Sequence, residues 1–215
     1  VQYIARHPQI NVLSLPDAAR KYGQIPECID RLSLYAAAQR VCALGQIVIE
    51  ERYSPAEVLM AFAEGLLLFA RGGSMPDTLP RREVLGPLED PVIIPEPPGA
   101  LAWDTLRDLA GSLQHTVAGT GHLPANLLGP SGGRVGLGSL YRALAEAVVV
   151  ICQDGRPPES VQLRTFDRQP RVGSAIGRRY TEAAECRLVE PNVNINNLYR
   201  MGKLQCWTLA PSWSA

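Results

Sequence analysis

The sequence predicts a mainly α protein with a few short strands, built from two repeated helix–loop–helix units that each end in a Gly-x-x-Pro turn. Two observations lead to this fold class. Apolar residues recur at helical spacing in several segments, which is typical of amphipathic helices. The form Gly-x-x-Pro-x-x-apolar occurs at residues 73–79, 121–127 and 155–161. Composition agrees, because aromatic residues make up 6% of the 215 residues while Ala and Leu are plentiful.

The repeat is clearest around two copies of an Ala-x-Ala-Glu sequence, at residues 61–64 and 143–146. At the same offset the glycines of the first and third turns align, and Arg82 aligns with Arg164. The apolar positions of the two helices that precede these turns also coincide. An ungapped pattern of this kind indicates an internal repeat.

Capping signals set the expected ends of the helices. We expect helices over residues 32–44, 55–71, 101–117 and 138–153. Ser54 and Pro55 predict an N-cap followed by Pro at the first helical position, with Glu57 as the capping-box partner. Gly after each helix supplies a left-handed residue, so we expect a positive φ at Gly121.

The chain divides into five segments. These are residues 1–25, the end of a preceding domain with a strand and a helix; 26–86, the first helical unit; 87–99, a Pro-rich linker; 100–172, the second helical unit; and 173–215, an extension with a terminal strand. Five prolines make the linker a stiff, extended spacer. Alternating apolar and polar residues at 204–209 predict the terminal strand.

Charge and hydropathy exclude several classes of protein. Lys plus Arg equals Asp plus Glu, at 21 each, so the basic surplus of a nucleic-acid-binding protein is missing. The longest apolar run, 58–70, is interrupted by Glu64 and Gly65 and is shorter than the roughly 20 residues of a transmembrane helix. None of the five Cys lies in a CxxC pair, so we expect no structural zinc. One disulfide remains open.

Candidate catalytic motifs are incomplete. Gly129–Gly133 matches the G-x-S-x-G nucleophile elbow, but the chain has no His after His122 to serve as the base. The following glycine-rich stretch, 133–139, lacks the Lys of a phosphate-binding loop. The three His residues fit neither HxxxH nor HExxH spacing. We therefore assign no catalytic residue, metal or cofactor, although an enzyme of another type would require a deep, polar pocket.

Two segments resemble known families. The sequence Gly-His-Leu-Pro-Ala-Asn-Leu at 121–127, followed by Arg-Val-Gly at 134–136 and a helix over 139–150, resembles the pseudomurein-binding repeat. That family attaches proteins to cell-wall polymers, so the resemblance implies a wall polysaccharide or another glycan as partner.

The N-terminal segment, Tyr-Ile-Ala-Arg-His-Pro-Gln-Ile-Asn-Val-Leu-Ser-Leu-Pro-Asp-Ala-Ala at 3–19, resembles the last strand and helix of a NodB-type polysaccharide deacetylase barrel. The Asp-Asp pair and His-x-x-x-His metal site of that family are not found in this sequence. A chain that starts at Val1, without Met, suits a fragment of a longer protein with an adjacent catalytic domain. Together the resemblances imply an extracellular or cell-surface protein.

Sugar sites combine aromatic faces with amide and guanidinium donors. The candidate ligand contacts are Trp103, His122, Asn126, Arg134 and Tyr141. For Trp103 and Tyr141, core packing is the commoner role of an aromatic residue at helical spacing. The leading hypothesis is a non-catalytic glycan-binding or wall-anchoring module. The alternative is a scaffold or protein-interaction module without a glycan ligand.

Overall fold

The computed structural model describes residues 26–45, 52–88, 99–129, 132–164 and 207. The described part is mainly helical, with short strands in small sheets, as the sequence predicts. The helices are α3 (Arg31–Leu44), α4 (Pro55–Gly72), α5 (Trp103–Thr120) and α6 (Leu137–Asp154). The antiparallel strand pairs are β1 (Cys28–Asp30) with β2 (Thr78–Pro80), β3 (Gly99–Ala102) with β6 (Ser160–Leu163), and β4 (Asn126–Leu128) with β5 (Arg134–Gly136).

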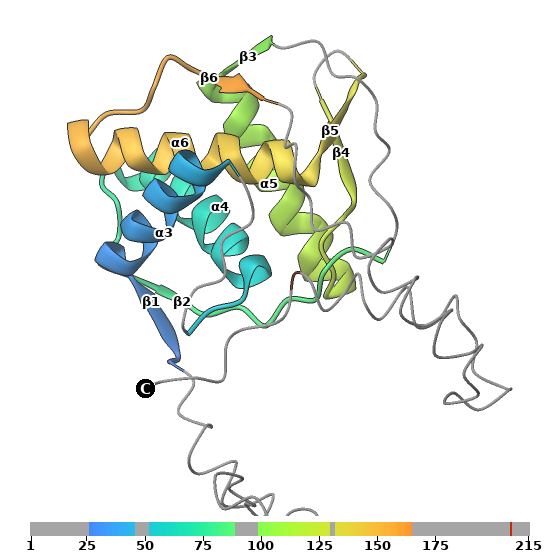
Figure 1. Ribbon diagram of the computed structural model, residues 1–215, viewed down its shortest axis with the longest axis horizontal. Helices are drawn as coiled ribbons and strands as arrows, with labels where there is room; N and C mark the ends of the chain where they lie inside the picture. Colours follow the sequence, from blue (N-terminus) through green and yellow to red (C-terminus); the bar gives the residue numbers. More distant parts are fainter. Residues whose placement is uncertain (1–25, 46–51, 89–98, 130–131, 165–206, 208–215) are drawn as a thin grey trace, which may run out of the picture.

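Two central helices, α4 and α6, pack against each other and contribute more buried core residues than the other two helices (Figure 1). The outer helix α3 packs mainly on α6, and the outer helix α5 packs mainly on α4. Small residues line the central helices, including buried alanines at 61, 63, 143, 145 and 147. Small side chains let helix backbones approach closely. The outer helices instead bury a single apolar stripe each, as amphipathic surface helices do.

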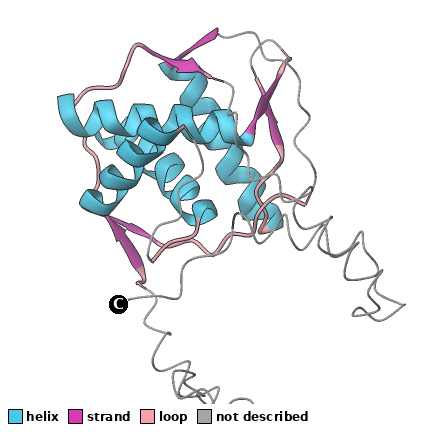
Figure 2. Ribbon diagram, viewed as in Figure 1, coloured by secondary structure: helices cyan, strands magenta, loops and turns pink. Residues whose placement is uncertain are grey.

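The three strand pairs lie at the periphery of the helical core (Figure 2). β1 leads into α3 and pairs with β2, which follows α4. In the same way β3 leads into α5 and pairs with β6, which follows α6. β4 and β5 form a local ribbon between the end of α5 and the start of α6. This ribbon is what places the candidate site.

The predicted capping signals are confirmed, but α5 spans Trp103–Thr120 rather than 101–117, because residues 101 and 102 pair with β6 as part of β3. Ser54 accepts a hydrogen bond from the backbone N–H of Glu57, and the Glu57 side chain accepts one from the N–H of Ser54, which completes the capping box. The glycines after α4, α5 and α6 have φ of 72°, 72° and 66°. Each donates its backbone N–H to a carbonyl in the last turn of the preceding helix. The expected positive φ at Gly121 is therefore correct.

Several sequence predictions lie outside the described residues. These are the segment 3–19, most of the Pro-rich linker, and the terminal strand at 204–209 apart from Trp207, whose backbone is helical. Within the described residues, none of the helices combines the length and the hydropathy that crossing a membrane requires.

Candidate functional site at the end of α5

A pocket of about 470 Å³ opens where the end of α5 meets the Gly-x-x-Pro turn and the β4–β5 ribbon. Its lining residues are Leu88, Thr116, Thr120, His122, Leu123, Pro124, Ala125, Asn126, Leu127, Leu128 and Arg134. They come from four separate stretches of chain: residue 88, the last turns of α5, the turn with β4, and β5. The pocket therefore depends on the tertiary fold rather than on one local motif.

The turn that forms the base of the pocket is held by backbone hydrogen bonds on both sides. Gly121 donates its N–H to the carbonyl of Val117 at 2.8 Å, which ends α5. Leu85 donates its N–H to the carbonyl of Gly121 at 3.1 Å and accepts one from Leu123 at 2.9 Å. Leu85 and His122 thus form a parallel bridge. This pairing fixes the segment that carries Leu88 against the turn and builds one wall of the pocket.

The ribbon presents the polar side chains of the pocket. Leu128 is the cross-strand partner of Arg134, and Asn126 lies two residues before Leu128. Side chains alternate between the faces of a strand, so these three lie on one face of the ribbon. The opposite face carries Leu127 and Val135, which are buried in the core. Burial of this apolar pair orients Asn126 and Arg134 toward the pocket.

The pocket has a positive electrostatic character. No carboxylate lines it, and Arg134 has no ion-pair partner among the residues that the structure describes. The backbone N–H of His122 donates to Thr120 Oγ1 at 3.1 Å. In the described part of the chain, Nδ1 of His122 is buried and has no hydrogen-bond partner. The pocket thus offers the guanidinium group of Arg134, whereas Nδ1 of His122 is covered by protein atoms.

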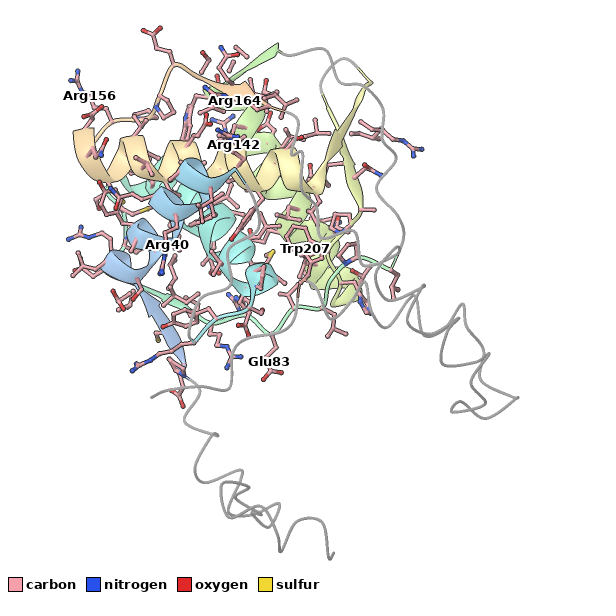
Figure 3. All side chains as sticks on the ribbon, in the orientation of Figure 1. Arg40, Glu83, Arg142, Arg156, Arg164 and Trp207 are labelled. Carbon is pink, nitrogen blue, oxygen red and sulfur yellow. The ribbon has the colours of Figure 1, made fainter. Side chains whose placement is uncertain are left out.

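The structure brings together three of the five predicted contact residues, His122, Asn126 and Arg134. The other two lie elsewhere. Trp103 begins α5 and packs edge-on against Phe69, with ring centroids 6.2 Å apart. Tyr141 is fully buried in α6, and its ring lies 5.6 Å from that of Phe62 and 5.9 Å from that of Trp207, labelled in Figure 3. Both aromatic residues pack against other aromatic side chains, which is the core-packing role that their helical spacing also indicated.

Four lining residues lie outside the turn and strand that sequence reasoning singled out, 121–127 and 134–136. Thr116 and Thr120 are four residues apart at the end of α5, so they share a face that leads to Gly121. That spacing is a signal that could have identified them. Leu88 gave no such signal, because the pairing of Leu85 with the turn joins segments far apart in the sequence. Leu128 lies one residue beyond the motif and is placed by its pairing with Arg134.

Other reactive side chains in the described regions have structural roles. Burial, with a smaller contribution from Glu146, raises the pKa of Cys42 to about 11, so its thiol stays protonated at neutral pH. Burial also raises the pKa of Cys152. Glu57 pairs with Arg81 at 2.6 Å. The described residues include no group of three His, Cys, Asp or Glu side chains placed to hold a metal ion.

Comparisons with protein-family models, with curated proteins and with solved structures find no match to this chain. The role of the pocket therefore has to be inferred from its own geometry and chemistry.

Proposed function

We propose that the chain is a non-catalytic glycan-binding module and that the pocket at the end of α5 is its ligand site. The observation that carries the proposal is the meeting of His122, Asn126 and Arg134 in one pocket. All three are among the sugar contacts that the sequence predicts. The volume of about 470 Å³ falls within the range of roughly 300–1,000 Å³ for small-ligand sites.

The chemistry of the pocket suits a sugar ring. Sugar hydroxyls both donate and accept hydrogen bonds. Arg134 supplies donors, and the side-chain amide of Asn126 is both donor and acceptor. Leu88 and Leu128 line the same pocket and supply apolar contact for the C–H faces of a ring. The carbonyl groups at the end of α5 carry partial negative charge and attract hydroxyl donors.

We also propose that the helical core consists of two repeated units, 28–80 and 99–163. In each, the strand that enters the first helix pairs with the strand that leaves the second. Positions aligned by the repeat also pair alike: Arg82 contacts Glu64 at 3.1 Å, and Arg164 contacts Glu146 at 4.0 Å. Arg142 and Arg164 lie close together beside α6 in Figure 3, and both contact Glu146.

The biological setting of this module rests on the two resemblances. We propose a wall-anchoring role at the cell surface or outside the cell, next to a polysaccharide deacetylase-like catalytic domain. The turn and strand that resemble the pseudomurein-binding repeat, 121–127 and 134–136, are the ones that form the pocket. This overlap supports placing the ligand there rather than at the other two Gly-x-x-Pro turns.

The test is retention of the 215-residue chain on immobilised wall polysaccharide. We expect retention that free oligosaccharide competes away and that Asn126→Ala or Arg134→Ala reduces at an unchanged melting temperature. Arg156→Ala is the matched control. Arg156 is exposed beyond the far end of α6 (Figure 3), and this 18-residue helix is about 27 Å long at 1.5 Å per residue.

A protein-interaction scaffold is the alternative, and it also has an observation in its favour. Leu32 and Leu44 of α3 are exposed, at 78% and 58% of their surface. A scaffold would show no retention that free oligosaccharide competes away. Retention that is insensitive to Asn126→Ala and Arg134→Ala would place glycan binding outside this pocket.

A further inference from the structure

A second hollow, of about 730 Å³, lies between the end of α4 and the outer face of α5. It is lined by Leu67, Ala70, Arg71, Arg107, Asp108, Gly111, Ser112, His115 and Thr116. Thr116 also lines the pocket of the candidate site, so the two hollows adjoin on α5. The two adjoining hollows are together called the α5 groove.

One row of side chains on α5 forms the floor of the α5 groove. Asp108, Ser112, Thr116 and Thr120 are spaced four residues apart and therefore lie in one row. The row spans about 18 Å, since twelve residues rise by 1.5 Å each. Thr116 donates its hydroxyl to the carbonyl of Ser112, and Thr120 donates to that of Thr116, both at 2.9 Å. Thr116 Oγ1 keeps its lone pairs as acceptors along the row, whereas Thr120 Oγ1 also accepts the N–H of His122.

Positive charge is placed at the two ends of the groove. Arg71 lies at one end and Arg134 at the other, and neither has an ion-pair partner within the described residues. The acid that lines the groove, Asp108, contacts Arg107 at 3.3 Å, and Arg107 also contacts Asp104 at 2.9 Å. The groove therefore has a local positive excess, although the formal net charge of the chain is zero.

We propose that the α5 groove binds a linear glycan that carries carboxylates, with one carboxylate at Arg134 and another at Arg71. This inference rests on the proposed glycan-binding function and adds the charge and the length of the ligand. Guanidinium groups pair well with carboxylates. Two arginines that lie apart suit a polymer that carries a carboxylate on each repeating unit. The carboxyl end of α5 has partial negative charge, so a singly charged carboxylate is less disfavoured there than a doubly charged phosphate.

A single-stranded nucleic acid fits the groove less well. Such ligands bind through bases stacked on aromatic side chains as well as through phosphate contacts. Among the residues that the structure describes, none that lines the two hollows is Phe, Tyr or Trp. The sugar hydroxyls of a glycan, by contrast, match the row of Ser and Thr oxygens.

Calorimetric titration of the full chain with oligogalacturonates tests the proposal. The probes are a dimer, a hexamer and the fully methyl-esterified hexamer, which has the same length without the charge. We expect the hexamer to bind about a hundredfold more tightly than its ester, because the ester loses two charged contacts that contribute about tenfold each. We also expect Arg71→Gln to weaken the hexamer about tenfold and leave the dimer unchanged.

Arg134→Gln should weaken both oligomers, and the control Arg156→Gln should weaken neither. Equal binding of the acid and its ester would overturn the charge requirement while leaving the proposed function standing. A hexamer affinity insensitive to Arg71→Gln would overturn the single groove, as would equally tight, Arg134-dependent binding of single-stranded DNA. If none of the three oligomers binds, this inference fails, and retention on wall polysaccharide decides the proposed function separately.

Discussion

The two central helices begin in different ways. At the start of α4, Ser54 and Glu57 form a capping box, and Glu57 also accepts a hydrogen bond from Arg81 Nε at 2.7 Å. At the start of α6, the N-cap is Gly136, which makes no side-chain cap. Instead β5 runs directly into the helix, and Leu137 donates its N–H to the carbonyl of Ala125 at 3.2 Å.

This difference separates the residues that stabilise the fold from those of the proposed ligand site. The first half uses three polar side chains to satisfy and fix the start of its helix. The second half uses backbone pairing within the β4–β5 ribbon, so the side chains of Asn126 and Arg134 line the pocket instead. Substitutions at the start of α4 should therefore change stability, and those at the ribbon should change binding.

The largest expected effect is at Glu57, whose side chain is 5% exposed. Glu57→Ala removes the capping box and leaves Arg81, which is 16% exposed, without its carboxylate. We expect a loss of about 2–3 kcal/mol in the free energy of unfolding by urea, from the lost cap and the broken ion pair. Glu83→Ala, at an exposed position nearby that Figure 3 labels, should change it by less than about 0.5 kcal/mol. Equal effects of the two would mean that the start of α4 is not specially stabilised.

The next effect is at the turn that forms the pocket. Gly121 has φ of 72°, and nothing lies within 4 Å of an added Cβ, so the cost of a side chain is in the backbone. Gly121→Val should destabilise the fold by about 1–2 kcal/mol, since a β-branched residue is strained there. Gly119→Val is the matched control, because Gly119 lies within α5 and also has open space around it. Its melting temperature should be unchanged or slightly raised, as Val disfavours a helix less than Gly.

A smaller effect compares the aligned ion pairs of the proposed repeat. Arg82 makes two hydrogen bonds to Glu64, which raise the pKa of Arg82. Arg164 approaches Glu146 at 4.0 Å, and Glu146 also pairs with Arg142. The arginine side chains are 54% and 57% exposed, so solvent screens both pairs. We expect Arg82→Ala to cost about 0.5–1 kcal/mol and Arg164→Ala less than about 0.5 kcal/mol in thermal unfolding. The reverse order would contradict the stability difference between the halves.

Local signals in the sequence predicted the helices and their ends. Ser54, Pro55, Glu57 and the turn glycines act within a few residues, so their effects can be read without knowing the fold. The pairing of β3 with β6 and of Leu85 with His122 could not be read in this way, because tertiary packing sets their partners. The polar part of the site was predicted from the turn and strand around residues 121–136. Its apolar wall and the extension along α5 depend on contacts between distant segments.

The smallest expected change in stability is at His122, where we expect an effect on binding with almost none on folding. His122 contributes to the fold through its backbone, by the N–H donated to Thr120 Oγ1 and by the bridge to Leu85. His122→Ala keeps both, and it removes a ring whose Nδ1 has no partner in the described part of the chain. The free energy of unfolding should therefore change by less than about 0.5 kcal/mol. Retention on wall polysaccharide should fall, because the ring lines the pocket. If His122→Ala instead unfolds the protein, the ring is part of the core and its assignment to the ligand face is wrong.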